Sequence, residues 1–125
     1  PMNGESQEIE ELFKKLCAQP KRLFPQKRHP LDVPSEHGVY IIRKEDAVLH
    51  IGRTLRGKDG LHQRLENHLH ESSSFAVKYL KGKGATLRDG RHTYQFLELE
   101  DSRKRALLEA YAIGTLCPEH LGLGE

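Results

Sequence analysis

The alternation of hydrophobic and polar positions predicts a helix at the start of the chain and an irregular segment after it. Apolar side chains recur there at the spacing of one helix face, at Ile9, Leu12, Phe13, Leu16 and Cys17. We therefore expect an amphipathic packing helix over residues 5–18. Residues 19–36 contain four prolines and little periodicity, which is typical of an extended connector. We therefore predict an N-terminal helix with its connector over residues 1–36 and a domain over residues 37–125.

Three short runs with the composition of strands follow. Residues 39–43 and 47–53 are rich in β-branched side chains and flank the polar segment Lys44-Glu45-Asp46, which predicts a hairpin. If those three residues form the loop, Tyr40 lies directly opposite His50. Alternation of aromatic and other side chains predicts a third strand over residues 93–99.

Helical periodicity returns twice in the second half of the chain. Residues 60–70 place Leu61, Leu65 and Leu69 on a buried stripe, with Arg64 and His68 one turn apart on the adjacent face. A final helix is expected from a cap at Asp101 or Ser102 to about Leu116, before Pro118. Residues 72–91 suggest a short helix over 75–80 and then a Gly-rich basic loop. The elements predict an α/β (α+β) fold, a small, mainly antiparallel three-stranded sheet flanked by helices.

Length and cysteine content limit the class of protein. The chain of 125 residues and 14.3 kDa fits one domain with one main core. Cys17 and Cys117 lie far apart and form no CxxC pair, so neither a disulfide framework nor a structural zinc site is indicated. No apolar run approaches the roughly 18 residues of a membrane span, and we expect a cytoplasmic protein without a membrane partner.

Charge is distributed unevenly along the chain, although the formal net charge is only +2. Residues 53–92 contain nine Lys or Arg against four Asp or Glu, whereas residues 93–125 contain three against six. A phosphate backbone could therefore lie along the middle of the chain. The candidate contacts there are Arg53, Lys78, Lys81, Lys83, Arg88 and Arg91.

Four sequence elements in a fixed order carry a family resemblance. They are Gly38-Val39-Tyr40-Ile41-Ile42, His50-Ile51-Gly52-Arg53-Thr54, Leu61-x-x-Arg64-x-x-x-His68, and Glu109 in a later helix. This set, spanning residues 38–122, resembles the GIY-YIG nuclease family. The resemblance implies a metal-dependent endonuclease that hydrolyses DNA, and RNA is not excluded as a substrate. Small domains of this family usually take their target from an attached domain or a protein partner.

The resemblance also implies a role for each residue of the site. Tyr40 would activate water, Arg64 would hold the scissile phosphate, and His68 would relay a proton or orient the water. Glu109 would bind one Mg²⁺ or Mn²⁺ ion. His50 stands where the family usually has a tyrosine, and an unperturbed histidine pKa of about 6.5 would suit neutral chemistry.

Two departures from the family pattern keep other interpretations open. Besides the histidine in the second motif, residues 118–122 lack the asparagine that family members usually carry, and His120 is the available substitute. Glu109 could also form a plain ion pair with Arg105. The alternative function is therefore a catalytically degenerate GIY-YIG-like module that binds nucleic acid or a protein partner. A weaker alternative is a structural adaptor that docks through its N-terminal helix.

Overall fold

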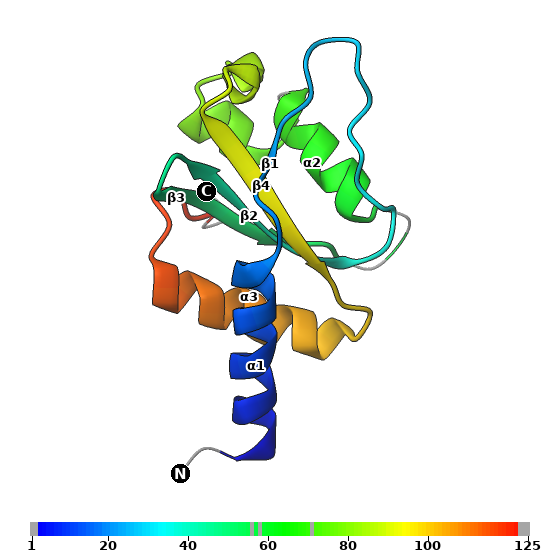
Figure 1. Ribbon diagram of the computed structural model, residues 1–125, viewed down its shortest axis with the longest axis vertical. Coiled ribbons are helices and arrows are strands. Elements are labelled where there is room, and N and C mark those ends of the chain that lie inside the picture. The colour runs from blue at the N-terminus through cyan, green and yellow to red at the C-terminus, as the bar shows by residue number, and fades with distance from the viewer. Residues whose placement is uncertain (1–2, 56, 58, 71, 123–125) are drawn as a thin grey trace.

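A four-stranded sheet with helices on both faces forms the core of the protein (Figure 1). The computed structural model describes residues 3–55, 57, 59–70 and 72–122. In chain order the elements are α1 (Gly4–Ala18), β1 (Arg22–Leu23), β2 (Gly38–Lys44), β3 (Ala47–Arg53), α2 (Leu61–Leu69), a π-helical segment (Phe75–Tyr79), a 3₁₀ segment (Gly84–Arg88), β4 (His92–Glu98) and α3 (Ser102–Leu116). All strand pairs are antiparallel, and the strand order is β1-β4-β2-β3.

The β2–β3 hairpin forms as predicted, but in a different register. Lys44 pairs with Ala47, so the turn has two residues, and Glu45 in that turn has a positive φ of 53°. One extra residue, Leu49, forms a bulge in β3, and Tyr40 then pairs with Gly52. The predicted pairing of Tyr40 with His50 is therefore wrong. The observed pairing differs from the predicted one by two positions. The Tyr40 and His50 side chains therefore still lie on one face of the sheet, with ring centroids 6.0 Å apart.

The proline-containing connector supplies a fourth strand that the sequence pattern did not indicate. Arg22 pairs with Tyr94 and Leu23 with Thr93, which makes β1 an edge strand of two residues. A strand this short has no measurable hydrophobic period. The Gln95 side chain fastens the start of the connector, because its amide donates to the Gln19 carbonyl at 2.9 Å. The domain boundary at residue 36 stays a prediction.

The sheet separates two hydrophobic clusters. The cluster between the sheet and the helices α1 and α3 comprises Ile9, Leu16, Val39, Ile41, Ile51, Leu108 and Ala112. On the other face, under α2 and the segments that follow it, the core includes Tyr40, Ile42, Leu61, Leu65, Leu69, Phe75 and Leu87. Figure 1 shows α2 and α3 on opposite sides of the strands. The predicted leucine stripe of α2 is confirmed, since all three leucines are buried.

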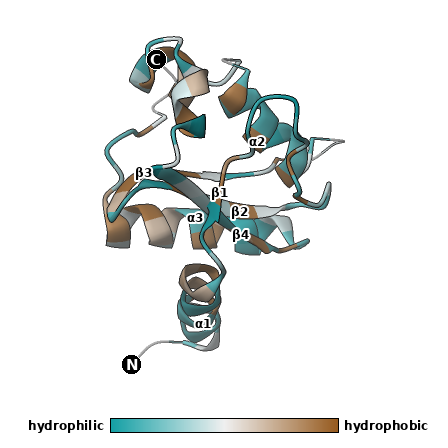
Figure 2. Ribbon diagram, turned by 45° about the horizontal axis from the view of Figure 1, so that its top comes forward, coloured by the Kyte–Doolittle hydropathy of each residue, from teal (hydrophilic) through white to brown (hydrophobic). Residues whose placement is uncertain are grey.

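Helix α1 extends away from the sheet and packs on α3 (Figures 1 and 2). Asn3 caps it by accepting from the Ser6 amide at 2.7 Å. Two surface ion pairs join the helices: Arg103 binds Glu5, and Lys104 binds Glu8. Within the described part of the chain, no helix has the length and apolar character that crossing a membrane requires.

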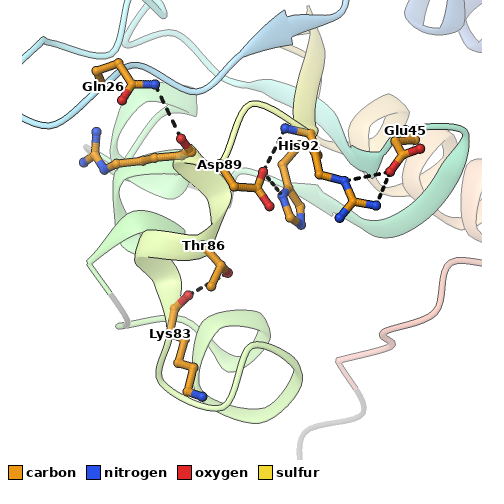
Figure 3. Close-up of polar contacts among 8 residues, drawn as sticks. Gln26, Glu45, Lys83, Thr86, Asp89 and His92 are labelled. Carbon is orange, nitrogen blue, oxygen red and sulfur yellow. Dashed lines mark hydrogen bonds and ion pairs between the residues drawn. The ribbon is translucent and has the colours of Figure 1, made fainter.

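Backbone and side-chain contacts hold the predicted basic loop in place (Figure 3). Asp89 accepts from the Arg91 amide and pairs with the His92 ring, both at 2.8 Å. Arg91 also binds Glu45, which ties this segment to the turn between β2 and β3. Gln26 reaches it from the connector by donating to the Arg88 carbonyl.

Candidate active site

A pocket of about 250 Å³ lies along β3, which forms the edge of the sheet opposite β1. Four separate parts of the chain supply its charged and imidazole side chains. His50 and Arg53 come from β3, Arg64 from α2, Glu109 from α3 and His120 from the segment after α3. The pocket thus brings together three residues that the sequence placed in the catalytic site, His50, Arg64 and Glu109.

The Glu109 carboxylate is held by Arg53. Arg53 Nε lies 3.0 Å from Glu109 Oε1, and the two side chains are 32% and 24% exposed. The alternative ion pair with Arg105 is not formed. Arg105 is instead 3% exposed, and its guanidinium donates to three backbone carbonyls.

Those three hydrogen bonds fix the position of the Arg53–Glu109 pair. Arg105 donates to Thr54 at 3.1 Å, directly after β3, and to Leu99 and Glu100 at 3.0 and 2.6 Å, before α3. The end of β3 is therefore fastened to the start of the helix that carries Glu109. Arg105 shapes the site without entering its chemistry.

Two histidines in the pocket are neutral at physiological pH. His50 is 9% exposed and stacks on Phe75 with ring centroids 4.8 Å apart. Burial lowers its pKa to about 3, helped by the neighbouring His120 and Arg64. The expected pKa near its ordinary value is therefore wrong. Burial, with the charge of Lys78, also lowers the pKa of His120.

These histidines also leave hydrogen-bonding capacity unused. Among the described residues, neither ring nitrogen of His50 has a hydrogen-bond partner, and the same is true of His120 Nε2 and Arg64 Nε. Buried polar atoms without partners are costly, and they concentrate where a ligand or water completes the set. This pocket is therefore prepared for a polar ligand.

Tyr40 and His68 form a second layer behind the pocket. Tyr40 is completely buried, and its hydroxyl lies 2.7 Å from His68 Nε2. Burial raises the pKa of Tyr40 to about 12, outweighing the opposing charge and hydrogen bond of Arg64. Burial also lowers the pKa of His68 well below its ordinary value, and the charges of His50 and Arg64 add to this. Tyr40 therefore lies between Arg64 and His68 and interacts with both.

Gly52 of the second motif leaves room for the Tyr40 ring. A Cβ atom at position 52 would lie 2.5 Å from Tyr40 Cζ and 3.0 Å from Cε1. Such contacts are too short for a buried ring to accept. The glycine is therefore required by the packing of the first motif against the second, which explains why both motifs belong to one site.

Some functional candidates lacked a usable signal in the sequence. Ser73 lies 2.6 Å from His68 Nδ1, yet it stands in the run Ser72-Ser73-Ser74, where no local pattern distinguishes it. Phe75 stacks on His50 from a π-helical turn. The sequence did provide a signal for His120, namely its place where the family has asparagine.

The predicted nucleic-acid contacts fall into three groups. Lys78, Lys81 and Lys83 are exposed. Arg88 and Arg91 already bind protein groups, since Arg88 donates to the Pro25 carbonyl at 2.5 Å and Arg91 binds Glu45. Of all these basic residues, only Arg53 is among the described lining of the pocket.

Among the described residues that line the pocket, one carboxylate is available for a metal ion. Within the described residues, no group of three or more His, Cys, Asp or Glu is arranged to hold a metal. Glu109 is the single carboxylate among the described residues that line the pocket. This donor set fits Mg²⁺ or Mn²⁺ bound largely by water and substrate phosphate, and it does not fit zinc.

Comparison with known proteins shows the fold. No family model and no curated protein matches the chain. Among solved structures, the GIY-YIG N-terminal endonuclease domain of UvrC from Thermotoga maritima, bound to magnesium as its catalytic divalent cation, matches with a TM-score of 0.51 and 19% identity, covering 94% of this chain and 97% of that domain.

Two point mutants of the same domain, one of a tyrosine and one of an asparagine, match with TM-scores of 0.50 and 0.51 at 19% identity. Both matches cover 94% of this chain and 96% of the other, and both mutants are bound to the catalytic divalent cation. The predicted α+β class is confirmed. The chain has the nuclease-like fold of the GIY-YIG endonuclease domain.

Proposed function

We propose that this protein is a metal-dependent endonuclease that hydrolyses DNA phosphodiester bonds by a GIY-YIG-type mechanism. The observation that carries the proposal is the pocket on β3, where two guanidinium groups, a carboxylate and two neutral imidazoles converge from four parts of the chain. The fold supports it, because similar solved structures are endonuclease domains bound to a catalytic divalent cation.

Glu109 is the proposed ligand for Mg²⁺ or Mn²⁺. A bound divalent cation would supply charge stabilisation for the leaving oxygen and the phosphate. Glu109 suits this role because it is partly exposed in the pocket and lies beside unpartnered polar atoms. Arg53 binds one of the two carboxylate oxygens, and a cation bound through that oxygen would free the guanidinium to contact a phosphate.

Arg64 is the proposed anchor of the scissile phosphate. Its guanidinium lines the pocket, and its Nε is buried without a partner among the described residues. A guanidinium held in this way can neutralise charge that develops on the phosphate in the transition state. Tyr40 lies beside Arg64 and is in turn hydrogen-bonded to His68.

His50 and His120 are the proposed contacts of the attacking water. Both line the pocket, and each has an unpartnered ring nitrogen among the described atoms. Since the pKa of His50 is lowered to about 3, its ring would orient the water and would not retain the proton. Tyr40 is less suited to activate water, because it is fully buried and its pKa is raised to about 12.

The exposed lysines offer a path for the DNA backbone. Lys78 lies close enough to His120 to affect its pKa, and Lys81 and Lys83, later in the same segment of the chain, are also exposed. Arg53 and Leu55 also line a wider depression of about 730 Å³. These contacts address phosphates, which DNA and RNA share, so the choice of DNA over RNA rests on the resemblance to the family.

Incubation with linear, nicked, branched and single-stranded DNA in Mg²⁺ or Mn²⁺ tests the proposal. We expect cleavage that a chelator stops and that Glu109→Gln abolishes, because the amide keeps the volume of the side chain but loses the charge. Glu100→Gln, at an exposed position, is the matched control and should cleave at the parent rate. Equal cleavage by Glu109→Gln and the parent would contradict the metal assignment.

One observation favours a second candidate function, a non-catalytic module that binds nucleic acid. The Arg53 ion pair satisfies the Glu109 carboxylate without any metal ion. Such a module would bind DNA equally well in chelator and would not cleave any of the substrates. A titration of Mn²⁺ into the parent and into Glu109→Gln separates the two functions, because only the endonuclease requires binding that depends on Glu109.

A further inference from the structure

We propose that Ser73 is a positioning residue of the site: it holds His68 in the tautomer with hydrogen on Nδ1, so that Nε2 accepts the hydrogen bond of Tyr40. Ser73 lies outside the four sequence motifs. The expected effect on cleavage rests on the proposed function, whereas the tautomer of His68 is a property of the folded protein alone.

A buried chain of short contacts carries this inference. Tyr40 Oη lies 2.7 Å from His68 Nε2, and His68 Nδ1 lies 2.6 Å from Ser73 Oγ. The Ala76 amide donates to the same Ser73 oxygen at 3.0 Å. Tyr40, His68 and Ser73 are 0%, 1% and 6% exposed, so each polar atom depends on its neighbours in the chain.

The direction of the hydrogen bonds follows from Arg64. A guanidinium can only donate, so the Tyr40 oxygen beside it acts as the acceptor. The Tyr40 proton must then be donated elsewhere, and His68 Nε2 is the group within reach. A nitrogen that accepts carries no hydrogen. In a neutral ring the hydrogen is therefore on Nδ1, which donates to Ser73 Oγ.

The reverse arrangement is less favourable. If the Ser73 hydroxyl donated to Nδ1, then Nε2 would carry the hydrogen and point it at the Tyr40 oxygen. The Tyr40 proton would face the Arg64 donors in a completely buried site. A buried donor without an acceptor destabilises the folded protein. In the first arrangement the remaining donor is the hydroxyl of Ser73, the most exposed of the three residues in the chain.

This order of hydrogen bonds fixes how Tyr40 faces Arg64. With its proton directed at His68, the Tyr40 oxygen turns its lone pairs toward the guanidinium that is proposed to hold the phosphate. Removing the Ser73 oxygen would leave Nδ1–H without its acceptor and allow the other tautomer to form. Arg64 would then lose the acceptor that holds it, although every residue of the pocket lining is still present.

The tautomer can be measured directly from the ¹⁵N chemical shifts of the His68 ring at neutral pH. We expect Nδ1 to have the shift of a protonated nitrogen and Nε2 that of an unprotonated one. Ser73→Ala should shift His68 toward a mixture of tautomers, and Ser73→Thr, which keeps the hydroxyl, should restore the parent pattern. The exposed neighbour Ser72 provides the control Ser72→Ala, which should leave both shifts unchanged.

Cleavage provides the second readout. We expect Ser73→Ala to lower kcat roughly tenfold, as loss of one hydrogen bond would, while KM stays near the parent value. Ser73→Thr should recover most of the rate. A parent His68 with hydrogen on Nε2, or a Ser73→Ala protein with unchanged shifts, would overturn the inference. If no substrate is cleaved but the predicted tautomer is found, the proposed function fails and the assignment of the tautomer stands.

Discussion

The buried histidines predict that the protein loses stability in mildly acidic solution. His50 and His68 are at least nine-tenths covered by the fold, and burial lowers both pKa values from an ordinary value of about 6.5. Unfolding exposes the rings and restores that ordinary value. The unfolded chain therefore binds more protons than the native protein at every pH between the two values. Stability is greatest above pH 6.5 and falls as the pH decreases below it.

The size of the loss follows from the number of rings. Each neutral buried histidine contributes a slope of about 1.36 kcal/mol per pH unit well below the pKa of the unfolded state. Integration from about pH 7.5 to about pH 5.5 gives roughly 1.4 kcal/mol for each ring, and therefore about 2.7 kcal/mol for His50 and His68 together. Protonation of His120, whose pKa is also lowered, acts in the same direction.

Urea denaturation at the two pH values measures this loss of stability. An equal slope m at both pH values would confirm that unfolding exposes the same surface area. His50→Phe keeps the stacking on Phe75 but cannot bind a proton, so the pH dependence should fall by roughly 1.4 kcal/mol. The exposed His29 provides the control His29→Gln, which should leave the dependence as it is. A free energy of unfolding that is flat over this range would refute the reasoning, because it would mean that the native rings bind protons freely.

Two further substitutions test the packing and the charges of the pocket. Gly52→Ala forces a Cβ into the Tyr40 ring and should cost roughly 1–3 kcal/mol of stability in urea, whereas Gly114→Ala, on an exposed turn of α3 with nothing within 4 Å, should be neutral or stabilising. Arg53→Gln removes the competitor for Glu109 and should tighten Mn²⁺ binding in calorimetry without DNA; weaker binding would show that Arg53 helps to form the metal site.

The sequence predicted elements well where a long hydrophobic period exists. The leucine stripe of α2 spans nine residues, and its three members all turn inward. The prediction of the hairpin register was wrong because the register depends on two local features, a two-residue turn and the bulge at Leu49. Each of them shifts the pairing by one position. Strand β1 was not predicted, because two residues cannot show an alternation of hydrophobic and polar side chains.

The site was predictable to the extent that its residues lie in ordered motifs. The motifs located His50, Arg64 and Glu109, which line one pocket, and Tyr40, which lies behind it. The motifs could not show how deeply each of these side chains is buried. Burial changes the pKa of His50 to about 3 and that of Tyr40 to about 12, and burial arises from residues such as Phe75 that belong to no motif.

The pairing of Arg53 with Glu109 links the two kinds of binding that the proposed function needs. Both residues lie in the pocket, and Arg53 Nε lies 3.0 Å from Glu109 Oε1. A cation that binds Glu109 through that oxygen displaces the Arg53 side chain. The positive charge of Arg53 is then free beside the proposed path of the DNA backbone. Because a released arginine can pair with a phosphate, metal binding should favour DNA binding, and by linkage DNA should favour the metal to the same degree. Under the proposed function, the ion pair would satisfy the Glu109 carboxylate whenever no cation is bound to it.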